Sequence, residues 1–372
     1  MYFLVLFCIR ILKKTKKILI IIQRSNGDVF LSSNLINVLY KYFNSPEIDL
    51  LVNDDTINIA KLLPNICSIH QFSYKKKNKQ RWQQEKILIK SIFKKYDLSI
   101  NLTASDRSVF YALLASNRSL SAVEKKNKKS WWKKFLLSHY YYFDSNKHIL
   151  TNNSEPLKYL KIEHKNIQSP IPISDQIVSR LKLKLNKLGI KEFIIFHPSA
   201  QYNYKIYPKP LRNELIDSLN KLGLPILITG SSNDIDSKIS LEIPKHSNIF
   251  NFIGQTSLEE YFALSQLSIA YIGMDTLNMH IAASQNKPIF AIFGSTKLSM
   301  WSPWSNRLES GIKTNNPIQK YDEITIFQSS LPCNVCGFFG CGNNHGNDKF
   351  TFDISPTKIF EEVQSWYKKL NV

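Results

Sequence analysis

Residues able to bind phosphate or move a proton stand at three places in the sequence, each directly after a run of apolar residues. The first is the turn Arg24–Asp28, which follows the apolar run Lys17–Gln23 and precedes a stretch with helical spacing. Asp28 would lie beside a helix N-terminus, where the helix dipole favours negative charge, and could accept a proton from a substrate hydroxyl. The same position suits a capping residue, so the sequence leaves both roles open.

The second place is the loop His197–Tyr207, which leaves a predicted strand and presents Ser199 and Lys205. A single lysine in a loop is usually solvated surface. Open α/β sheets, however, bind their ligands where strands end. The position of Lys205 after a strand therefore suits phosphate binding equally well.

The third place is the segment Met274–Ser284, which begins directly after another predicted strand. Asp275 and Thr276 would stand at the N-terminus of the helix that follows, where free backbone N–H groups attract phosphate. His280 lies one helical turn further on and could face the same ligand. The alternatives are that Asp275 or Thr276 is an N-cap and that His280 is a core histidine whose ring is hydrogen-bonded within the protein.

Strands and helices alternate around these segments, which predicts an α/β fold with doubly wound parallel sheets. The predicted strands are Lys17–Gln23, Ile48–Val52, Ser68–Phe72, Leu98–Leu102, Phe193–His197, Pro225–Gly230, Ile249–Phe252, Ile269–Gly273 and Pro288–Gly294. The predicted helices with assigned bounds are Val29–Phe43, Leu211–Leu222, Ile235–Ile243, Ser257–Leu267 and Leu277–Ser284. Lys75–Lys79 and Lys125–Lys134 are predicted to be basic loops, the second followed by Tyr140–Tyr142.

The length of 372 residues suggests two domains, and the prolines of Gln168–Ser174 predict an extended linker between them. We expect a membrane-surface segment over residues 1–16, a Rossmann-like domain over 17–170, a second one over 171–355 and a C-terminal helix over 356–372. Two such domains facing across a cleft would present strand C-termini and helix N-termini to a shared ligand.

Positive charge is concentrated in the first half of the chain. Residues 1–186 hold 32 Lys and Arg against 13 Asp and Glu, whereas residues 187–372 hold 17 against 16. A basic half favours an anionic partner, which could be nucleic acid, an anionic membrane surface or a phosphorylated substrate. The alternative is that these lysines are ordinary solvated surface residues.

Five cysteines in so long a chain exclude a small disulfide scaffold, and no apolar run reaches the roughly 18 residues that span a bilayer.

The N-terminal residues 2–12 are apolar except for Arg10 and are followed by lysines at positions 13, 14, 16 and 17. A secretory signal places its charges before the apolar run, so this order does not fit one. A short apolar segment beside a basic cluster suits attachment to anionic lipid, and a helix buried under the domain is the alternative.

Together these segments resemble one known family. The turn Arg24–Asp28, the loop His197–Tyr207 and the run Gly273–Ser284, followed by KPIFAIFGSTKLSMWSPW, resemble the bacterial heptosyltransferases of glycosyltransferase family 9. The segment Cys333–Gly342 is similar to the C-terminal segment of the lipopolysaccharide core heptosyltransferases, above all the third-heptose type. The resemblance covers the chain from about Lys17 to Val363.

The resemblance implies a GT-B fold whose N-terminal domain binds the acceptor and whose C-terminal domain binds the donor. It implies inverting transfer of heptose from ADP-heptose to a phosphorylated lipid A–core acceptor, with no cofactor and no metal. Asp28 would be the general base, and Lys205 would neutralise the donor diphosphate. The donor-binding residues would be Ser199, Lys205, Asp234, Asp275, Thr276 and His280. The acceptor-binding residues would be Arg24, Lys128 and Lys129.

The chemistry of these residue types agrees with that function. Inverting transfer needs one base on the acceptor and positive charge or N–H dipoles on the leaving diphosphate. A helix N-terminus together with Lys205 can supply the latter. The basic first half would meet an acidic acceptor on a membrane surface, so we expect a cytoplasmic enzyme peripheral to the inner face of the inner membrane, and no nucleic-acid partner.

The sequence departs from the family pattern at several positions. The turn Arg24–Asp28 is two residues shorter than usual, Tyr207 stands where tryptophan is common, and Leu277 stands where glycine is usual. Because a leucine side chain limits the approach of the backbone to a phosphate, a transferase using another nucleotide sugar is an alternative. A non-catalytic membrane-binding or nucleic-acid-binding protein is a further alternative.

Two acidic or sulfur-rich segments could be mistaken for metal sites. Asn53–Asp55 follows a strand away from the donor motifs and is predicted to be a loop. Cys333, Cys336 and Cys341 with His345 have zinc-like spacing. The family resemblance accounts for this second segment without a metal, so no metal site is predicted.

Overall fold

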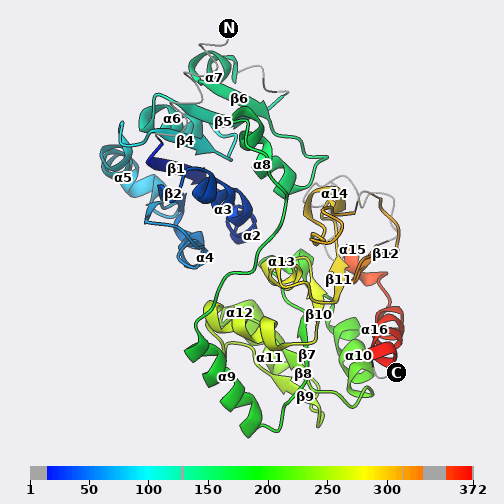
Figure 1. Ribbon diagram of the computed structural model, residues 1–372. Helices are drawn as coiled ribbons and strands as arrows, with labels where there is room; N and C mark the ends of the chain where they lie inside the picture. Colours follow the sequence, from blue (N-terminus) through cyan, green and yellow to red (C-terminus); the bar gives the residue numbers. More distant parts are fainter. Residues whose placement is uncertain (1–14, 126, 128–129, 313, 330–348, 371–372) are drawn as a thin grey trace. The chain divides into compact units, whose positions relative to one another are not determined.

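Each half of the chain builds its own parallel β-sheet (Figure 1). In the computed structural model the chain divides into two units, Met1–Ile171 and Pro172–Val372, so the division falls within the proline-containing segment. The structure describes residues 15–125, 127, 130–312, 314–329 and 349–370. The predictions for residues 1–14, for Lys128 and Lys129, and for the cysteine-rich segment with His345 lie outside the described residues.

The first unit is a six-stranded sheet in the order β3–β2–β1–β4–β5–β6, with every neighbouring pair parallel. This is the doubly wound order, in which the chain starts at the centre of the sheet and builds outward in both directions. Its strands are β1 Lys17–Ile22, β2 Glu47–Asn53, β3 Ser68–Phe72, β4 Leu98–Asn101, β5 Ser119–Val123 and β6 His139–Tyr142. Its helices are α2 Asn26–Phe30, α3 Ser33–Tyr42, η1 Asp54–Thr56, α4 Ile57–Ala60, α5 Lys77–Ile92, α6 Asp106–Ala115, α7 Trp131–Leu136 and α8 Ile149–Tyr159.

Helices cover both faces of this sheet, which explains why β1 is an unbroken apolar run. Residues Ile18–Ile22 are all buried, as expected for a central strand with no solvent-facing side. On one face Leu88 and Ile92 of α5 pack with Tyr111 of α6 against Leu19. On the other face α3 lies beside α8.

The second unit repeats the same order and adds one strand. Its sheet runs β12–β13–β11–β10–β7–β8–β9, and only β12 is antiparallel to its neighbour. The strands are β7 Ile194–His197, β8 Ile226–Ile228, β9 Ile249–Asn251, β10 Ala270–Met274, β11 Ile289–Phe293, β12 Ile318–Tyr321 and β13 Ile324–Gln328. The helices are α9 Asp175–Lys187, η3 Asn203–Lys205, α10 Lys209–Asn220, α11 Asp234–Leu241, α12 Leu258–Leu267, α13 Leu277–Ser284, α14 Leu298–Trp301, α15 Lys349–Phe352 and α16 Pro356–Leu370.

The core of the second unit lies between its sheet and two groups of helices. Helices α10, α11 and α16 contribute buried side chains such as Leu215, Ile239 and Ile359 to one face. Helix α12 packs against both α9 and α13 on the other (Figure 1). The C-terminal helix thereby becomes part of the core. Among the described helices, none has the length and apolar content needed to cross a membrane.

Several predicted elements need correction. The helix predicted over Val29–Phe43 is broken into α2 and α3, and Ser32 Oγ at the break donates to the Val29 carbonyl at 2.7 Å. Such a local side-chain bond gives the backbone an alternative to continuing the helix. The basic loop predictions were wrong in part, because α5 begins at Lys77 and α7 at Trp131. The strands β5, β6, β12 and β13 were not predicted.

Candidate functional site

The residues singled out by the sequence stand where each sheet reverses its strand order. This reversal lies between β1 and β4 in the first unit and between β7 and β10 in the second. The turn Arg24–Asp28 follows β1, the loop His197–Tyr207 follows β7, and Asp275 follows β10. Open α/β sheets bind ligands at such switch points, outside the carboxyl ends of the strands. Each unit therefore has an edge of the kind at which open α/β sheets bind their ligands.

An ion pair links the two loops at the switch point of the second unit. Lys205 Nζ lies 3.1 Å from Asp275 Oδ2, although the residues are 70 positions apart in the chain. The Asp275 side chain is 2% exposed and that of Lys205 is 21% exposed. Asp275 Oδ1 is buried without a hydrogen-bond partner among the described residues. The pair therefore presents an ammonium group toward solvent over a buried carboxylate.

A glycine allows β10 to approach β7 closely just before Asp275. Gly273 has a φ of +153°, and a Cβ at this position would overlap the carbonyl oxygen of His197. Gly273 and His197 are partners in the ladder between the two strands. Tyr271 Oη donates to the Met274 carbonyl at 3.0 Å, which further holds the end of β10. These contacts determine where Asp275 leaves the sheet.

Two residues, Asp275 and Thr276, separate the end of β10 from the start of helix α13. Thr276 occupies its N-cap position, but its side chain makes no capping hydrogen bond. The first N–H groups of a helix have no partner within the helix, so this terminus can receive an anion. His280, one turn further, is buried, and its ring centroid lies 6.5 Å from that of Trp301. Burial is compatible with both roles considered from the sequence, so donor binding by His280 stays a prediction.

A buried carboxylate that the sequence did not single out joins the loops after β7 and β8. Asp236 accepts hydrogen bonds from Ser231 N at 2.6 Å and from Ser231 Oγ at 2.8 Å, and Ser199 Oγ also donates to it. Asp234, which the family resemblance implies to be a donor-binding residue, is exposed and lies two positions earlier in the same turn of α11. The buried acidic side chain of this turn is therefore Asp236, and it holds Ser199 in place.

His197 is another titratable group at this edge. Burial, the largest effect, lowers its pKa to about 4, against the opposing influence of the Asp236 carboxylate. Its Nδ1 lies 3.1 Å from Thr229 Oγ1, and the Asn278 side chain is 3.0 Å from the ring nitrogens. His197 is thus a neutral hydrogen-bonding group at neutral pH and joins the ends of β7 and β8 to α13.

In the first unit, Asp28 is buried and held by its own turn. Its Oδ2 accepts from Ser25 Oγ at 2.7 Å and from Ser25 N at 3.3 Å, which makes it the third helical residue of a capping box. Its Oδ1 lies 2.8 Å from Arg24 Nε. The Arg24 guanidinium lies 4.8 Å from the centroid of the Phe143 ring. The capping role is therefore filled, and the same contacts fix the orientation of the carboxylate.

Polar side chains at the ends of neighbouring strands surround this turn. Gln23 N donates to Thr103 Oγ1 at 2.9 Å, which ties the end of β1 to the loop after β4. Asn53 Nδ2 donates to the Arg24 carbonyl at 3.4 Å. The Gln23 amide is buried, and neither of its polar atoms has a partner among the described residues. The sequence signal that could have identified Gln23 is a polar residue at the end of an apolar run.

Comparison with protein families decides the family. A model of "Glycosyltransferase family 9 (heptosyltransferase)" matches residues 87–329, well over half of the chain. The chain belongs to glycosyltransferase family 9. The family resemblance stated from the sequence is thereby confirmed.

Curated relatives of this family 9 glycosyltransferase agree with the assignment. The lipopolysaccharide heptosyltransferase 3 of Escherichia coli is 26% identical over 297 residues, covering 77% of this chain and 86% of its own. The lipooligosaccharide heptosyltransferase 2 of Haemophilus ducreyi is 26% identical over 319 residues, covering 78% of this chain and 87% of its own. The chain therefore spans most of the length of both relatives.

Solved structures show the same fold. The E. coli ADP-heptose lipopolysaccharide heptosyltransferase II superposes with a TM-score of 0.68 at 18% identity, covering 96% of this chain and all of the other. The E. coli heptosyltransferase WaaC with ADP gives a TM-score of 0.68 at 12% identity, covering 94% of this chain and 99% of the other. The predicted α/β fold of the GT-B type is confirmed.

The predicted site residues of this family 9 enzyme are thus distributed over two edges. The second unit pairs Lys205 with Asp275, just before the N-terminus of α13, and separately joins Ser199 to Asp236. Arg24 and Asp28 lie at the switch point of the first unit. Within the described part of the chain, no three His, Cys, Asp or Glu side chains are grouped so that they could hold a metal ion.

Proposed function

We propose that this enzyme transfers heptose from ADP-heptose to the inner core of lipopolysaccharide, with inversion at the anomeric carbon. The family and the names of the curated relatives support this donor and acceptor. So does the fold shared with a heptosyltransferase solved with ADP-2-deoxy-2-fluoro heptose, at a TM-score of 0.67 and 13% identity. The observation that carries the proposal is the Lys205–Asp275 pair beside the N-terminus of α13.

On the donor side, the positive groups at this edge would bind the diphosphate and stabilise it as a leaving group. An ammonium group has three N–H donors, and the contact with Asp275 uses one of them. The N–H groups of the first turn of α13 add dipoles directed at the same charge. Asp275 would hold Lys205 in position, and Asp236 would hold Ser199.

On the acceptor side, Asp28 would act as the general base. The acceptor hydroxyl oxygen attacks the anomeric carbon from the face opposite the diphosphate, the bond from that carbon to the diphosphate oxygen breaks, and Asp28 takes the hydroxyl proton. The contacts with Ser25 and Arg24 support this role because they hold a buried carboxylate in one orientation. Arg24 would also contact acidic groups of the acceptor.

Release of ADP in the presence of a deacylated, heptose-bearing inner-core acceptor tests the proposal. We expect the wild-type enzyme to release ADP only when both substrates are present. Asp28→Asn should lower kcat by about 10²–10⁴-fold, because a positioned base contributes about that much. Asp55→Asn is the matched control, since Asp55 is exposed in the same unit. Equal rates in wild type and Asp28→Asn would refute the assignment of the base.

A related transferase using another nucleotide sugar is the second candidate, and Leu277 is the residue that favours it. Leu277 is the first residue of α13, next to the place where a phosphate would approach the backbone. Binding of ADP-heptose, ADP-glucose and UDP-glucose should be compared by calorimetry in the wild type and in Leu277→Gly. Tight binding of a donor other than ADP-heptose by the wild type would establish this second candidate.

A further inference from the structure

Helix α7 of the first unit buries a lysine and exposes two of its aromatic side chains. A surface helix buries its apolar side chains and exposes its charged ones. In α7, however, Lys133 is only 1% exposed, whereas Trp131 is 70% exposed and Phe135 is 82% exposed. Trp131 and Phe135 are four positions apart and therefore lie on the same face of the helix. Exposure of two large aromatic side chains is unfavourable in water unless another surface covers them.

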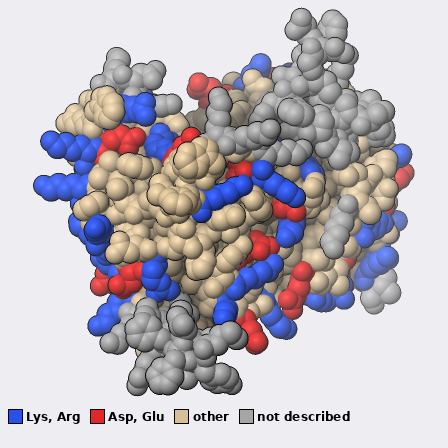
Figure 2. Space-filling view, turned by 90° about the horizontal axis from the view of Figure 1, so that it is seen from above, with Lys and Arg blue, Asp and Glu red and all other residues tan. Residues whose placement is uncertain are grey.

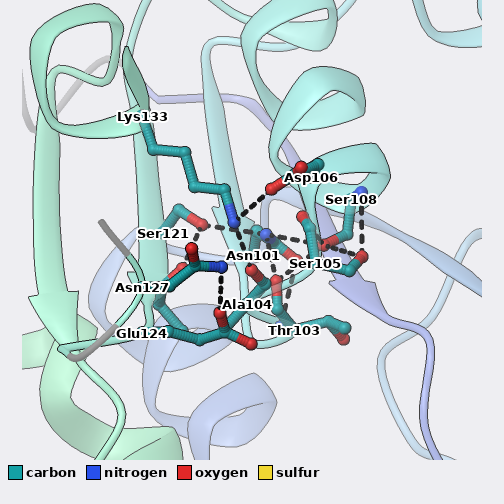
Figure 3. Close-up of polar contacts among 11 residues, drawn as sticks. Asn101, Thr103, Ala104, Ser105, Asp106, Ser108, Ser121, Glu124, Asn127 and Lys133 are labelled. Carbon is teal, nitrogen blue, oxygen red and sulfur yellow. Dashed lines mark hydrogen bonds and ion pairs between the residues drawn. The ribbon is translucent and has the colours of Figure 1, made fainter. Parts of the chain in front are cut away.

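The buried lysine holds this helix in place (Figure 3). Lys133 Nζ donates to the Ala104 carbonyl at 2.7 Å and lies 2.6 Å from Asp106 Oδ1. Ala104 lies in the loop between β4 and α6, and Asp106 is the first residue of α6. Asn101 at the end of β4 donates to the Thr103 carbonyl of the same segment. Helix α7 is therefore fixed to the carboxyl-terminal edge of the sheet, while its Trp131 and Phe135 side chains remain exposed.

Other side chains extend the exposed surface. Leu136 and Tyr142 are exposed, and Tyr142 lies on β6, the edge strand of the sheet. Lys134 Nζ lies 5.1 Å from the centroid of the Tyr142 ring. We call the surface formed by Trp131, Lys134, Phe135, Leu136 and Tyr142 the α7 face. Trp132 is partly buried and packs inward against Val109, Val123 and Leu137.

We propose that the α7 face docks on an anionic lipid bilayer surface. Tryptophan, tyrosine and lysine side chains suit the layer between headgroups and acyl chains, because each has an apolar body and a polar end. Charge complementarity supports an anionic surface, since residues 1–186 hold 32 basic against 13 acidic residues. Figure 2 shows Lys and Arg side chains spread over the face of the molecule that it presents. This docking would bring the acceptor-binding edge of the first unit to a membrane-embedded acceptor.

Sedimentation of the full-length protein with vesicles tests the proposal independently of transferase activity. Vesicles of phosphatidylglycerol and phosphatidylethanolamine should bind the wild-type protein, and vesicles of phosphatidylcholine should bind it more weakly. The double variant Trp131→Ala/Phe135→Ala should bind the anionic vesicles at least about tenfold more weakly, because it removes two apolar side chains that would be buried in the interface. Trp82→Ala is the matched control, since Trp82 on α5 is 83% exposed and lies outside the α7 face.

A second variant tests the part played by charge. Lys134→Glu should weaken binding to the anionic vesicles and leave the weak binding to phosphatidylcholine unchanged. Circular dichroism should show that all variants are folded, because every substituted side chain is at least partly exposed. If transfer is established, the double variant should retain the wild-type rate with a deacylated soluble acceptor and lose rate with an acceptor embedded in vesicles. That combination separates failed docking from failed catalysis.

Three outcomes would overturn the proposal. The first is unchanged vesicle binding by the double variant, or an equal loss in Trp82→Ala. The second is self-association of the wild type in sedimentation equilibrium that the double variant abolishes, with no vesicle binding, which would make the α7 face a contact between copies of the chain. The third is binding of a single-stranded oligonucleotide that depends on Trp131 while anionic vesicles do not bind.

Discussion

Replacement of Gly273 by alanine tests whether the close approach of β10 to β7 positions the donor edge. Besides overlapping the carbonyl oxygen of His197, a Cβ at this position would lie 2.9 Å from Tyr271 Oη. Because His197 and Gly273 are paired in the ladder, the methyl group fits only if two central strands separate. The shift would reach both Asp275 after β10 and Ser199 after β7.

Two costs add in this variant. A non-glycine residue held in a sparsely populated backbone region costs on the order of 1–3 kcal/mol. Forcing an extra methyl group into a packed interior costs about 1–3 kcal/mol more. The sum of about 2–6 kcal/mol is a large part of the roughly 5–15 kcal/mol that stabilises a typical domain. For a unit of this size it corresponds to a fall in Tm on the order of 10 °C.

Gly189→Ala is the matched control. Gly189 also has positive φ, at +73°, but no atom of the described residues beyond its chain neighbours lies within 4 Å of a Cβ at its position, so this variant carries the backbone cost alone. Scanning calorimetry should show a larger loss of Tm for Gly273→Ala than for Gly189→Ala, and ADP release should fall only in the first. Equal losses of Tm in the two variants would refute the contact argument. Full transferase activity in Gly273→Ala would refute the link to the donor edge.

Three further predictions concern the second unit. Asp236→Asn should lower the free energy of unfolding by about 1–3 kcal/mol and raise the KM for the donor substrate, because the new amide N–H group would face the hydrogen-bond donors of Ser231 and Ser199. Asp234→Asn is the control and should stay within about 0.5 kcal/mol of wild type in urea unfolding. Since the folded pKa of His197, about 4, lies below the ordinary 6.5, the unfolded chain binds the proton first as pH falls. His197 therefore lowers the free energy of unfolding progressively as the pH falls from 6.5 toward 4 and has no such effect above pH 6.5. In urea titrations, the free energy of unfolding should differ less between pH 7 and pH 5 in His197→Asn than in the wild type. Lys205→Ala should lower kcat/KM by roughly 10²–10³-fold through lost stabilisation of the leaving diphosphate, and Lys209→Ala, which removes an exposed lysine on α10, should leave the steady-state kinetics unchanged.

Much of the secondary structure could be predicted from the local pattern of apolar and polar residues in the sequence. The strand Ser68–Phe72 and the helix Leu277–Ser284 have the predicted bounds, and most other predicted elements differ by one or two residues. Buried parallel strands such as β1 form unbroken apolar runs, which are visible without any tertiary information. The strands β5 and β6 were missed because Ser119–Val123 and His139–Tyr142 contain polar and aromatic residues in short runs. Their strand conformation depends on ladder partners.

The candidate site could likewise be predicted from the sequence only in part. The sequence singled out Lys205 and Asp275 separately, because each follows the end of a strand. It could not indicate their ion pair, which depends on β7 and β10 being neighbours in the sheet. Asp234 and Asp236 stand in the same helical turn and are equally acidic, so only the direction of each side chain shows that Asp236 is the one held in the interior.

The sequence by itself determined the alternation of strands and helices, the family and the three segments that carry chemistry, because these depend on residues close together in the chain. The tertiary structure alone decided which residues meet across the sheet and which side chains face water. Helix α7 shows the physical reason. In the run WWKKFL, Trp131 and Phe135 would ordinarily be buried and Lys133 exposed, but the Ala104 carbonyl and the Asp106 carboxylate lie where the Lys133 ammonium can reach them. Partners distant in the chain reverse the orientation that composition alone predicts.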